Sequence, residues 1–132
     1  MNVNEMIILE GKGYHLDTFF TPVIHKNGDM VALVACTAVM TNESRLRLYQ
    51  FADQRNISVF EIPPNDAIGT KMKVGSFAAN ALPLPGVLIR PNQFSDPSID
   101  EKLIDMGINI VINPTSQFQL SGGSIHCITN EL

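Results

Sequence analysis

The chain repeats one order of short segments, and this order restricts its fold more than any other feature of the sequence. In the first copy, residues 15–24 and 30–36 favour strands and lie on either side of an Asn-Gly pair at residues 27–28, a strong signal for a hairpin. Residues 41–56 follow with a helical pattern, and the apolar segment 57–62 predicts a strand. A hairpin, a helix and a strand in this order are typical of an α/β fold.

A second copy of the same order follows, built from different residues. Residues 79–83 and 87–89 flank a Pro-Gly turn and predict another hairpin. Ser98 is a suitable N-cap for a helix that runs through Met106, and a glycine follows at the position where helices commonly end. Residues 108–112 are apolar and predict the closing strand.

Three further expectations concern single elements. Leu46, Tyr49 and Ala52 share one face of the first helix at helical spacing, so this face is predicted to be buried. Residues 6–9 are predicted to form a strand. A third copy of the pattern is predicted to begin with a strand near Ser124 and then to break off, which indicates either closure against an earlier strand or an incomplete set of repeats.

Composition narrows the class of protein. The 132 residues are 45% hydrophobic, which fits a single domain over residues 1–132 with a sizeable core. A net charge of −4 offers no basic surface for nucleic acid or for anionic lipid. No apolar run approaches the roughly 20 residues of a membrane-spanning helix, and residues 1–5 lack the pattern of a signal peptide. We therefore expect a cytoplasmic protein with neither nucleic acid nor membrane as a partner.

The chain has two cysteines in different surroundings. Cys36 ends the apolar run 30–36, where a cysteine usually acts as a small buried hydrophobe. Cys127 follows the polar, glycine-containing segment 121–124, in which two glycines allow a tight turn or a close approach of the backbone. In a reducing compartment both are expected to be free thiols rather than a disulfide.

The first functional hypothesis is a thiol nucleophile served by a histidine. Cys127 would be the nucleophile and His15 its acid/base partner, because an imidazolium favours the thiolate and exchanges protons with the substrate. In a strand, residues two apart face the same way, so Asp17 is predicted to lie beside His15. His126 is the weaker partner, because strand alternation would turn it away from Cys127. His25 adjoins the hairpin turn and is expected in solvent.

Two other hypotheses fit the same residues. A metal site could use His15 and Asp17 with His25, His126 or Cys127, but the chain has no close Cys-x-x-Cys or His-x-x-x-His pair, so we predict no metal. A non-catalytic α/β module whose exposed strand edges pair with another copy or another protein is equally compatible with the sequence. In that case Cys127 would be a packed structural residue.

Two motifs resemble one known family. Tyr-His-Leu-Asp-Thr-Phe-Phe at residues 14–20 and Ser-Gly-Gly-Ser-Ile-His-Cys-Ile-Thr at residues 121–129 look like motifs of the guanidino-group-modifying superfamily, the pentein fold. The first resembles the His-x-Asp-Thr element of arginine deiminase, and the second resembles the nucleophile segment of agmatine deiminase. Dimethylarginine dimethylaminohydrolase and the amidinotransferases belong to the same superfamily. Residues 80–89 resemble the intervening hairpin, so the resemblance covers most of the chain.

The resemblance implies a fold, a reaction and a set of site residues. The fold is an α/β propeller of five strand-and-helix units, of which this chain would hold about two and a half. Cys127 would attack a guanidinium carbon to form a covalent thiouronium, and His15 would protonate the departing amine and then activate water. Asp17 would bind the guanidinium nitrogens and Asn80 would line the site, with no cofactor and no metal.

The resemblance also shows a departure from the family. Its enzymes are much longer, and their N-terminal portion supplies further acidic residues that grip the guanidinium. This chain therefore resembles the C-terminal half of the catalytic domain: a fragment, a half that joins another chain, or a remnant that has lost activity. The expected partners are a small guanidino compound and either a second copy or a complementary N-terminal-half chain. The alternative to hydrolysis or amidino transfer is a catalytically incomplete half-domain that only binds such a partner.

Overall fold

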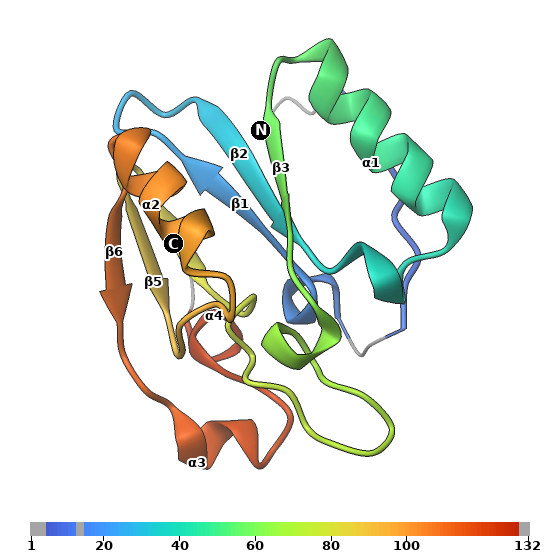
Figure 1. Ribbon diagram of the computed structural model, residues 1–132, viewed down its shortest axis with the longest axis vertical. Coiled ribbons are helices and arrows are strands. Elements are labelled where there is room, and N and C mark those ends of the chain that lie inside the picture. Colours follow the sequence, from blue (N-terminus) through green and yellow to red (C-terminus); the bar gives the residue numbers. More distant parts are fainter. Residues whose placement is uncertain (1–4, 13–14, 130–132) are drawn as a thin grey trace.

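The computed structural model describes residues 5–12 and 15–129 as a mixed α/β structure with two three-stranded sheets (Figure 1). In each sheet two strands form an antiparallel hairpin and the third runs parallel to the second, which confirms the repeated order predicted from the sequence. The first sheet contains β1 (Phe20–Ile24), β2 (Met30–Ala35) and β3 (Ser58–Glu61), and the second contains β4 (Leu82–Leu84), β5 (Val87–Arg90) and β6 (Asn109–Ile112). The helices are α1 (Asn42–Gln54), α2 (Pro97–Asp105), α3 (Ser116–Gln119) and α4 (Ile125–Ile128), with 3₁₀ turns at Leu16–Thr18, Thr37–Val39 and Pro64–Asp66.

The first hairpin turns where the Asn-Gly pair predicts it. Gly28 has a φ of +91°, a conformation that side chains with a Cβ rarely adopt. The backbone N–H of His25 donates to the carbonyl of Asp29 at 2.8 Å, and the Asn27 side chain exchanges hydrogen bonds with Asp29. The turn is therefore fixed by local interactions that the sequence alone specifies.

Both long helices have capped ends. Thr41 caps α1, because its hydroxyl accepts from the backbone N–H of Ser44 at 3.2 Å. The N-cap of α2 is Asp96, whose carboxylate accepts from the N–H of Ser98 at 2.9 Å, so the prediction of Ser98 as the cap was wrong by two residues. Aspartate is as good an N-cap residue as serine, and Asp96, which comes first in the chain, caps the helix. Gly107 follows α2 with a φ of +84°, as predicted.

The buried face of α1 differs from the predicted one. Ala52 is buried as predicted, together with Ser44 and Leu48, whereas Leu46 is 59% exposed and Tyr49 is 38% exposed. Apolar side chains occur almost all round the central turns of this helix, so their spacing does not select one face. The N-cap and the contact with the sheet decide the rotation instead.

Two predicted strands do not form. Residues 6–9 have no regular structure, and only the adjoining Gly11 makes an isolated bridge, with Met40. The strand predicted near Ser124 is the short helix α4, in which the N–H of Ile128 donates to the carbonyl of Ser124. Among the described residues no strand lies beside this segment, and its backbone N–H groups donate within the helix and to Asn80 instead.

The two units pack against one another and share buried side chains. The N–H of Gly86 in the second hairpin donates to the carbonyl of Ile24 at the end of β1, at 2.8 Å. Helix α1 packs along the first sheet and α2 along the second (Figure 1). Buried residues of both units form one hydrophobic cluster, including Val23, Leu33, Cys36, Leu48, Leu88 and Leu103. The expected burial of Cys36 is confirmed.

A buried charge joins β5 to α2. Arg90 at the end of β5 is fully buried and pairs with Asp100 of α2. Its guanidinium also lies 3.9 Å above the ring of Phe94. Desolvation lowers the pKa of Arg90, and the ion pair with Asp100 opposes this effect.

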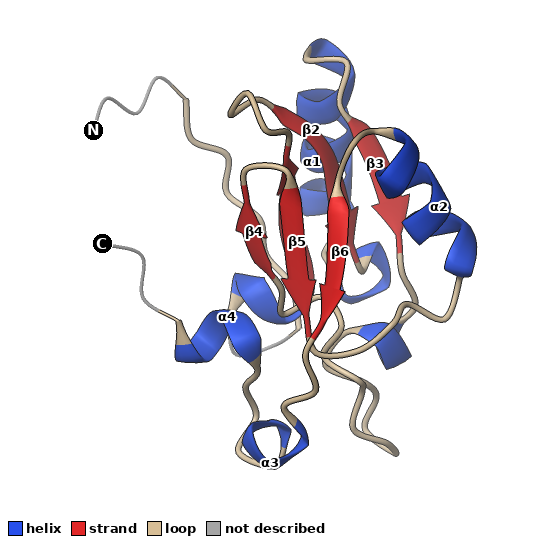
Figure 2. Cartoon of the chain, turned by 90° about the vertical axis from the view of Figure 1, so that its left-hand side faces the viewer, coloured by secondary structure: helices blue, strands red, loops and turns tan. Residues whose placement is uncertain are grey.

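The ends of the strands determine where a site can form. Because β2 with β3 and β5 with β6 are parallel pairs, their carboxyl ends lie toward the end of the molecule where α3 and α4 are placed (Figure 2). Sites of open α/β sheets are usually built at this end. Among the helices that the structure describes, the longest has 13 residues, and none has both the length and the apolar character needed to cross a membrane.

The orientation of α1 gives a test of the fold. Replacing Leu48 by Ala removes a fully buried side chain and is expected to lower the free energy of unfolding by about 2–5 kcal/mol. Leu46→Ala is the matched control, with an expected change within about 0.5 kcal/mol because Leu46 is exposed. Urea denaturation followed by circular dichroism measures both. A larger loss for Leu46→Ala would mean that α1 faces the sheet as the sequence alone suggested.

Candidate active site

The first arm of the site is a turn that precedes β1. Strand β1 begins only at Phe20, so the prediction that His15 and Asp17 lie on one strand was wrong. Leu16–Thr18 forms a 3₁₀ turn, and the buried Thr18 hydroxyl donates to the carbonyl of His15 at 2.6 Å. Serine and threonine side chains stabilise turns in this way. The turn nevertheless brings His15 and Asp17 to one cavity.

The second arm is the segment that carries Cys127. Helix α4 is anchored by the buried Ile125 and by Ser124, whose hydroxyl lies 2.5 Å from that of Thr115. Cys127 is exposed on this helix. A Cβ at Gly123 would lie 3.2 Å from the Cβ of Cys127 and 3.5 Å from its Sγ. Glycine at position 123 therefore leaves open space beside the thiol.

The side chain of Asn80 joins the two arms. Asn80 is fully buried, and its Nδ2 lies 3.1 Å from the Sγ of Cys127 and 3.1 Å from the carbonyl oxygen of Asp17. Its Oδ1 accepts from the backbone N–H of Cys127 at 3.3 Å. One amide thus holds the thiol, the backbone of the same cysteine and the turn opposite.

The carboxylate of Asp17 has one occupied oxygen and one unoccupied oxygen. Oδ2 accepts from the Sγ of Cys127 at 3.3 Å and lies 2.9 Å from Nδ1 of His126. Oδ1 is buried and has no hydrogen-bond partner within residues 5–12 and 15–129. A buried acceptor without a donor is costly, so this oxygen is suited to a hydrogen bond from a bound ligand.

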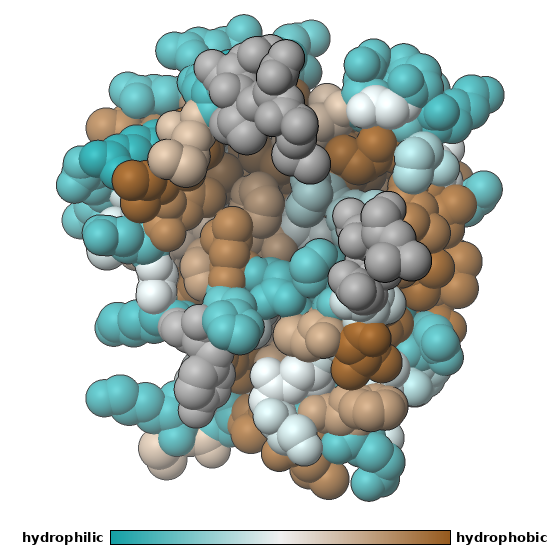
Figure 3. Space-filling model, turned by 180° about the vertical axis from the view of Figure 1, so that it is seen from behind, coloured by the Kyte–Doolittle hydropathy of each residue, from teal (hydrophilic) through white to brown (hydrophobic). Residues whose placement is uncertain are grey.

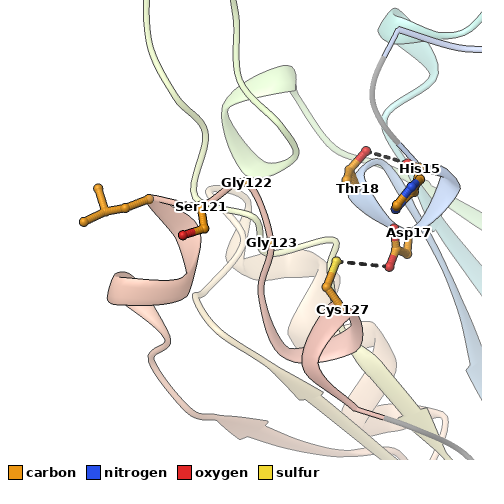
Figure 4. Close-up of a pocket in the computed structure, with 8 residues that line it drawn as sticks. His15, Asp17, Thr18, Ser121, Gly122, Gly123 and Cys127 are labelled. Atoms are coloured by element: carbon orange, nitrogen blue, oxygen red, sulfur yellow. Dashed lines mark hydrogen bonds between the residues drawn. The ribbon is translucent and has the colours of Figure 1, made fainter.

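His15, Asp17 and Cys127 line a cavity of about 750 Å³ (Figure 4). Figure 4 shows His15 and Asp17 on one side and Cys127 on the other, with Gly122 and Gly123 along the wall. A smaller depression of about 440 Å³ adjoins Asp17 and is lined by His15, Leu16, Phe20, Thr21, Pro22 and His126. The wall of the main cavity also includes Thr18, Leu120 and Ser121.

The site therefore contains predicted residues and one that the sequence argument set aside. His15, Asp17 and Cys127 line the cavity, and the buried Asn80 is hydrogen-bonded to Cys127. His126 reaches Asp17 because it is helical, whereas a strand was predicted. The position of His126 directly before the proposed nucleophile was the sequence signal that could have identified it as a site residue.

The hypothesis of a metal site gains no support from the geometry. His25 lies at the hairpin turn, where its Nδ1 accepts from the backbone N–H of Asn27, but it is half-buried beside Gly107 and not in solvent as expected. Within the part of the chain that the structure describes, no group of three His, Cys, Asp or Glu side chains is arranged to hold a metal ion.

The fold resembles solved arginine-metabolising enzymes. ArgZ, an arginine dihydrolase from the ornithine-ammonia cycle in cyanobacteria, matches 86% of this chain at 24% identity with a TM-score of 0.66, over 16% of its own length. AgrE in a ternary complex with ornithine and NAD⁺ matches 86% at 23% identity and a TM-score of 0.64, over 14% of its length. The product-bound N-terminal domain of ArgZ matches 90% at 21% identity and a TM-score of 0.64, over 39% of that domain.

These likenesses define the fold. The chain has the fold of one part of the pentein-fold arginine dihydrolases, which confirms the resemblance of its motifs at the level of structure. It spans 16% of full-length ArgZ and 39% of the N-terminal domain. No sequence model of a protein family and no curated protein sequence matches the chain.

The different surroundings of the two thiols give a second test. Iodoacetamide at neutral pH is expected to alkylate the exposed Cys127 at least about a hundredfold faster than Cys36. Burial raises the pKa of the Cys36 thiol, which further reduces its reactivity. Peptide mass spectrometry after timed quenching measures both rates, and unfolding in urea should make them similar. Equal rates in the native protein would contradict the placement of these residues.

Proposed function

We propose that this chain carries the nucleophile side of an enzyme that hydrolyses an arginine-like substrate at its guanidinium carbon. The observation that supports this most is the thiol of Cys127, which lies 3.3 Å from the Asp17 carboxylate on a cavity shared with His15. The nucleophile, an acid/base group and an anion for a cationic substrate thus face one space.

The reaction follows from the positions of these groups. The thiol of Cys127 gives its proton to His15 as its Sγ attacks the guanidinium carbon and forms a C–S bond. The bond from that carbon to one nitrogen breaks, His15 protonates the leaving amine, and a thiouronium remains on Cys127. His15 then takes a proton from water, which attacks the same carbon as the C–S bond breaks, and the thiol is regenerated. An amine in place of water would give amidino transfer.

Asp17 and Asn80 place the reacting atoms. The unoccupied Oδ1 of Asp17 accepts hydrogen bonds from the guanidinium nitrogens, and the charge of the substrate strengthens them. The Nδ2 of Asn80 contacts the Sγ of Cys127 and orients it. Asn80 therefore contributes to substrate binding indirectly, by placing the sulfur against the guanidinium carbon. Holding the carbon over the sulfur is the main contribution of such groups to the rate.

The similar proteins support this chemistry. The N-terminal domain of ArgZ has been solved covalently bound to a reaction intermediate. A mutant of the same domain has been solved with substrate, and a mutant of AgrE has been solved with L-arginine. A fold of this kind therefore accommodates an arginine substrate and a covalent intermediate. We therefore infer the same class of reaction for this chain, hydrolysis at a guanidinium carbon through a covalent intermediate.

We further propose that the chain supplies about two and a half of five propeller units and completes its site with another chain. The outer edges of β3 and β6 have no strand partner among the described residues. Figure 3 shows apolar side chains within a hollow of one face. Large apolar residues that are exposed include Leu16, Phe118, Leu120 and Ile128, in or near the site arms. The second candidate function, a half-domain that only binds its partner, rests on this same surface.

Catalysis is tested by replacing the nucleophile. Cys127→Ser is expected to lower kcat at least about a thousandfold without unfolding the protein, because an alcohol is a poorer nucleophile than a thiol. Cys36→Ala is the matched control and should keep activity, since Cys36 lies in the core. The assay measures ammonia, methylamine and ureido product from arginine, agmatine and methylated arginines. Unchanged turnover in Cys127→Ser would rule out this mechanism.

The state of assembly, measured together with turnover, separates an enzyme from a half-domain that only binds its partner. Size-exclusion chromatography with light scattering is expected to show a mass above the 14.5 kDa of one chain, because a monomer would expose strand edges and apolar surface. The same measurement with a complementary N-terminal-half chain should show a joint complex. A joint complex without turnover of any guanidine would favour the binding role. A stable monomer with no affinity for either partner would contradict the proposal of assembly.

A further inference from the structure

The ring of His126 contacts the carboxylate of Asp17 that we propose to bind the substrate. Its Nδ1 lies 2.9 Å from Oδ2 of Asp17, the oxygen to which the thiol of Cys127 also donates. His126 lines the smaller depression and not the main cavity. We propose that His126 is a positioning residue that fixes the Asp17 carboxylate so that Oδ1 remains available to a guanidinium. This inference rests on the proposed function.

The direction of the hydrogen bond follows from the chemistry of the two groups. An ionised carboxylate only accepts hydrogen bonds, so Nδ1 of His126 must carry a proton. This assignment holds for both the neutral and the charged ring. The neutral ring of His126 is therefore the tautomer protonated on Nδ1, with Nε2 left without a proton.

The backbone of His126 is held at both ends, which makes the ring a stable support. Its N–H donates to the carbonyl of Asn80 at 3.4 Å, and its carbonyl accepts from the hydroxyl of Thr129 at 2.9 Å. Successive residues of a helix turn by about 100° and not by the 180° of a strand. His126 and Cys127 can therefore both reach Asp17.

The contact matters because a carboxylate can rotate about its last bond. Without His126, only the weak thiol donor of Cys127 holds Oδ2, so the two oxygens of Asp17 can exchange roles and Oδ1 is no longer kept for the ligand. A hydrogen bond to a charged group typically changes affinity by about tenfold or more. The loss of His126 is therefore expected to weaken guanidinium binding more than it affects the chemical step.

Nuclear magnetic resonance tests the contact directly, without substrate. Long-range ¹H–¹⁵N spectra of the chain should show neutral His126 protonated on Nδ1. His25 is the internal control with the opposite tautomer, because its Nδ1 accepts from the N–H of Asn27. Asp17→Ala should shift His126 toward the Nε2-protonated form and leave His25 unchanged. A neutral His126 already protonated on Nε2, or one insensitive to Asp17→Ala, overturns the inference.

Protection of Cys127 from iodoacetamide by L-arginine tests the consequence. The arginine concentration that halves the alkylation rate is expected to rise about tenfold in His126→Ala. It should stay within about threefold of the wild type in His126→Asn, because the asparagine amide places a donor near the position of Nδ1. His25→Ala is the matched control at the hairpin turn, outside both depressions, and should match the wild type.

The outcomes separate this inference from the proposed function. Equal protection in His126→Ala and the wild type overturns the positioning role while the proposed function stands. Where arginine protects neither protein, the proposed function fails, and the tautomer of His126 alone decides whether the contact exists. Where turnover is measurable, His126→Ala should raise KM by a larger factor than it lowers kcat. A loss confined to kcat contradicts the positioning role.

Discussion

The buried amide of Asn80 is the contact on which the site depends. It bonds to the thiol and the backbone of Cys127 on one side and to the backbone of Asp17 on the other. These two residues are 110 positions apart in the chain, and neither arm contains regular structure long enough to fix the other. An amide with a donor and an acceptor, both used and both shielded from water, therefore sets the geometry between the Cys127 thiol and the Asp17 carboxylate.

The two repeated units provide the frame for this contact. Each is a small sheet with one helix, and neither could bury its apolar face alone. Their packing forms one cluster of buried side chains, and the hydrogen bond from Gly86 to Ile24 sets the hairpins side by side. The functional groups lie on turns and short helices beyond the strand ends, where local conformations unsuited to a core are tolerated.

The surroundings of Asp17 are suited to the cationic substrate that we propose, although the site has few charged groups. One carboxylate oxygen takes hydrogen bonds from Cys127 and His126, and the other is buried without a donor among the described residues. Asp17 thus lines the same cavity as His15 and Cys127 and keeps one acceptor without a donor. Such an arrangement favours a ligand that brings several donors and a positive charge.

The sequence by itself determined the repeated order of hairpin, helix and strand, and it singled out Cys127, His15 and Asp17 as candidates. Turn residues such as Gly28 and Gly107 act locally, so their effect is visible without the fold. Only the tertiary structure decided the face of α1 and the helical form of the segment around Cys127, because these depend on which neighbours are present to pack or to pair. That helix, and not the predicted strand, is what brings His126 to Asp17.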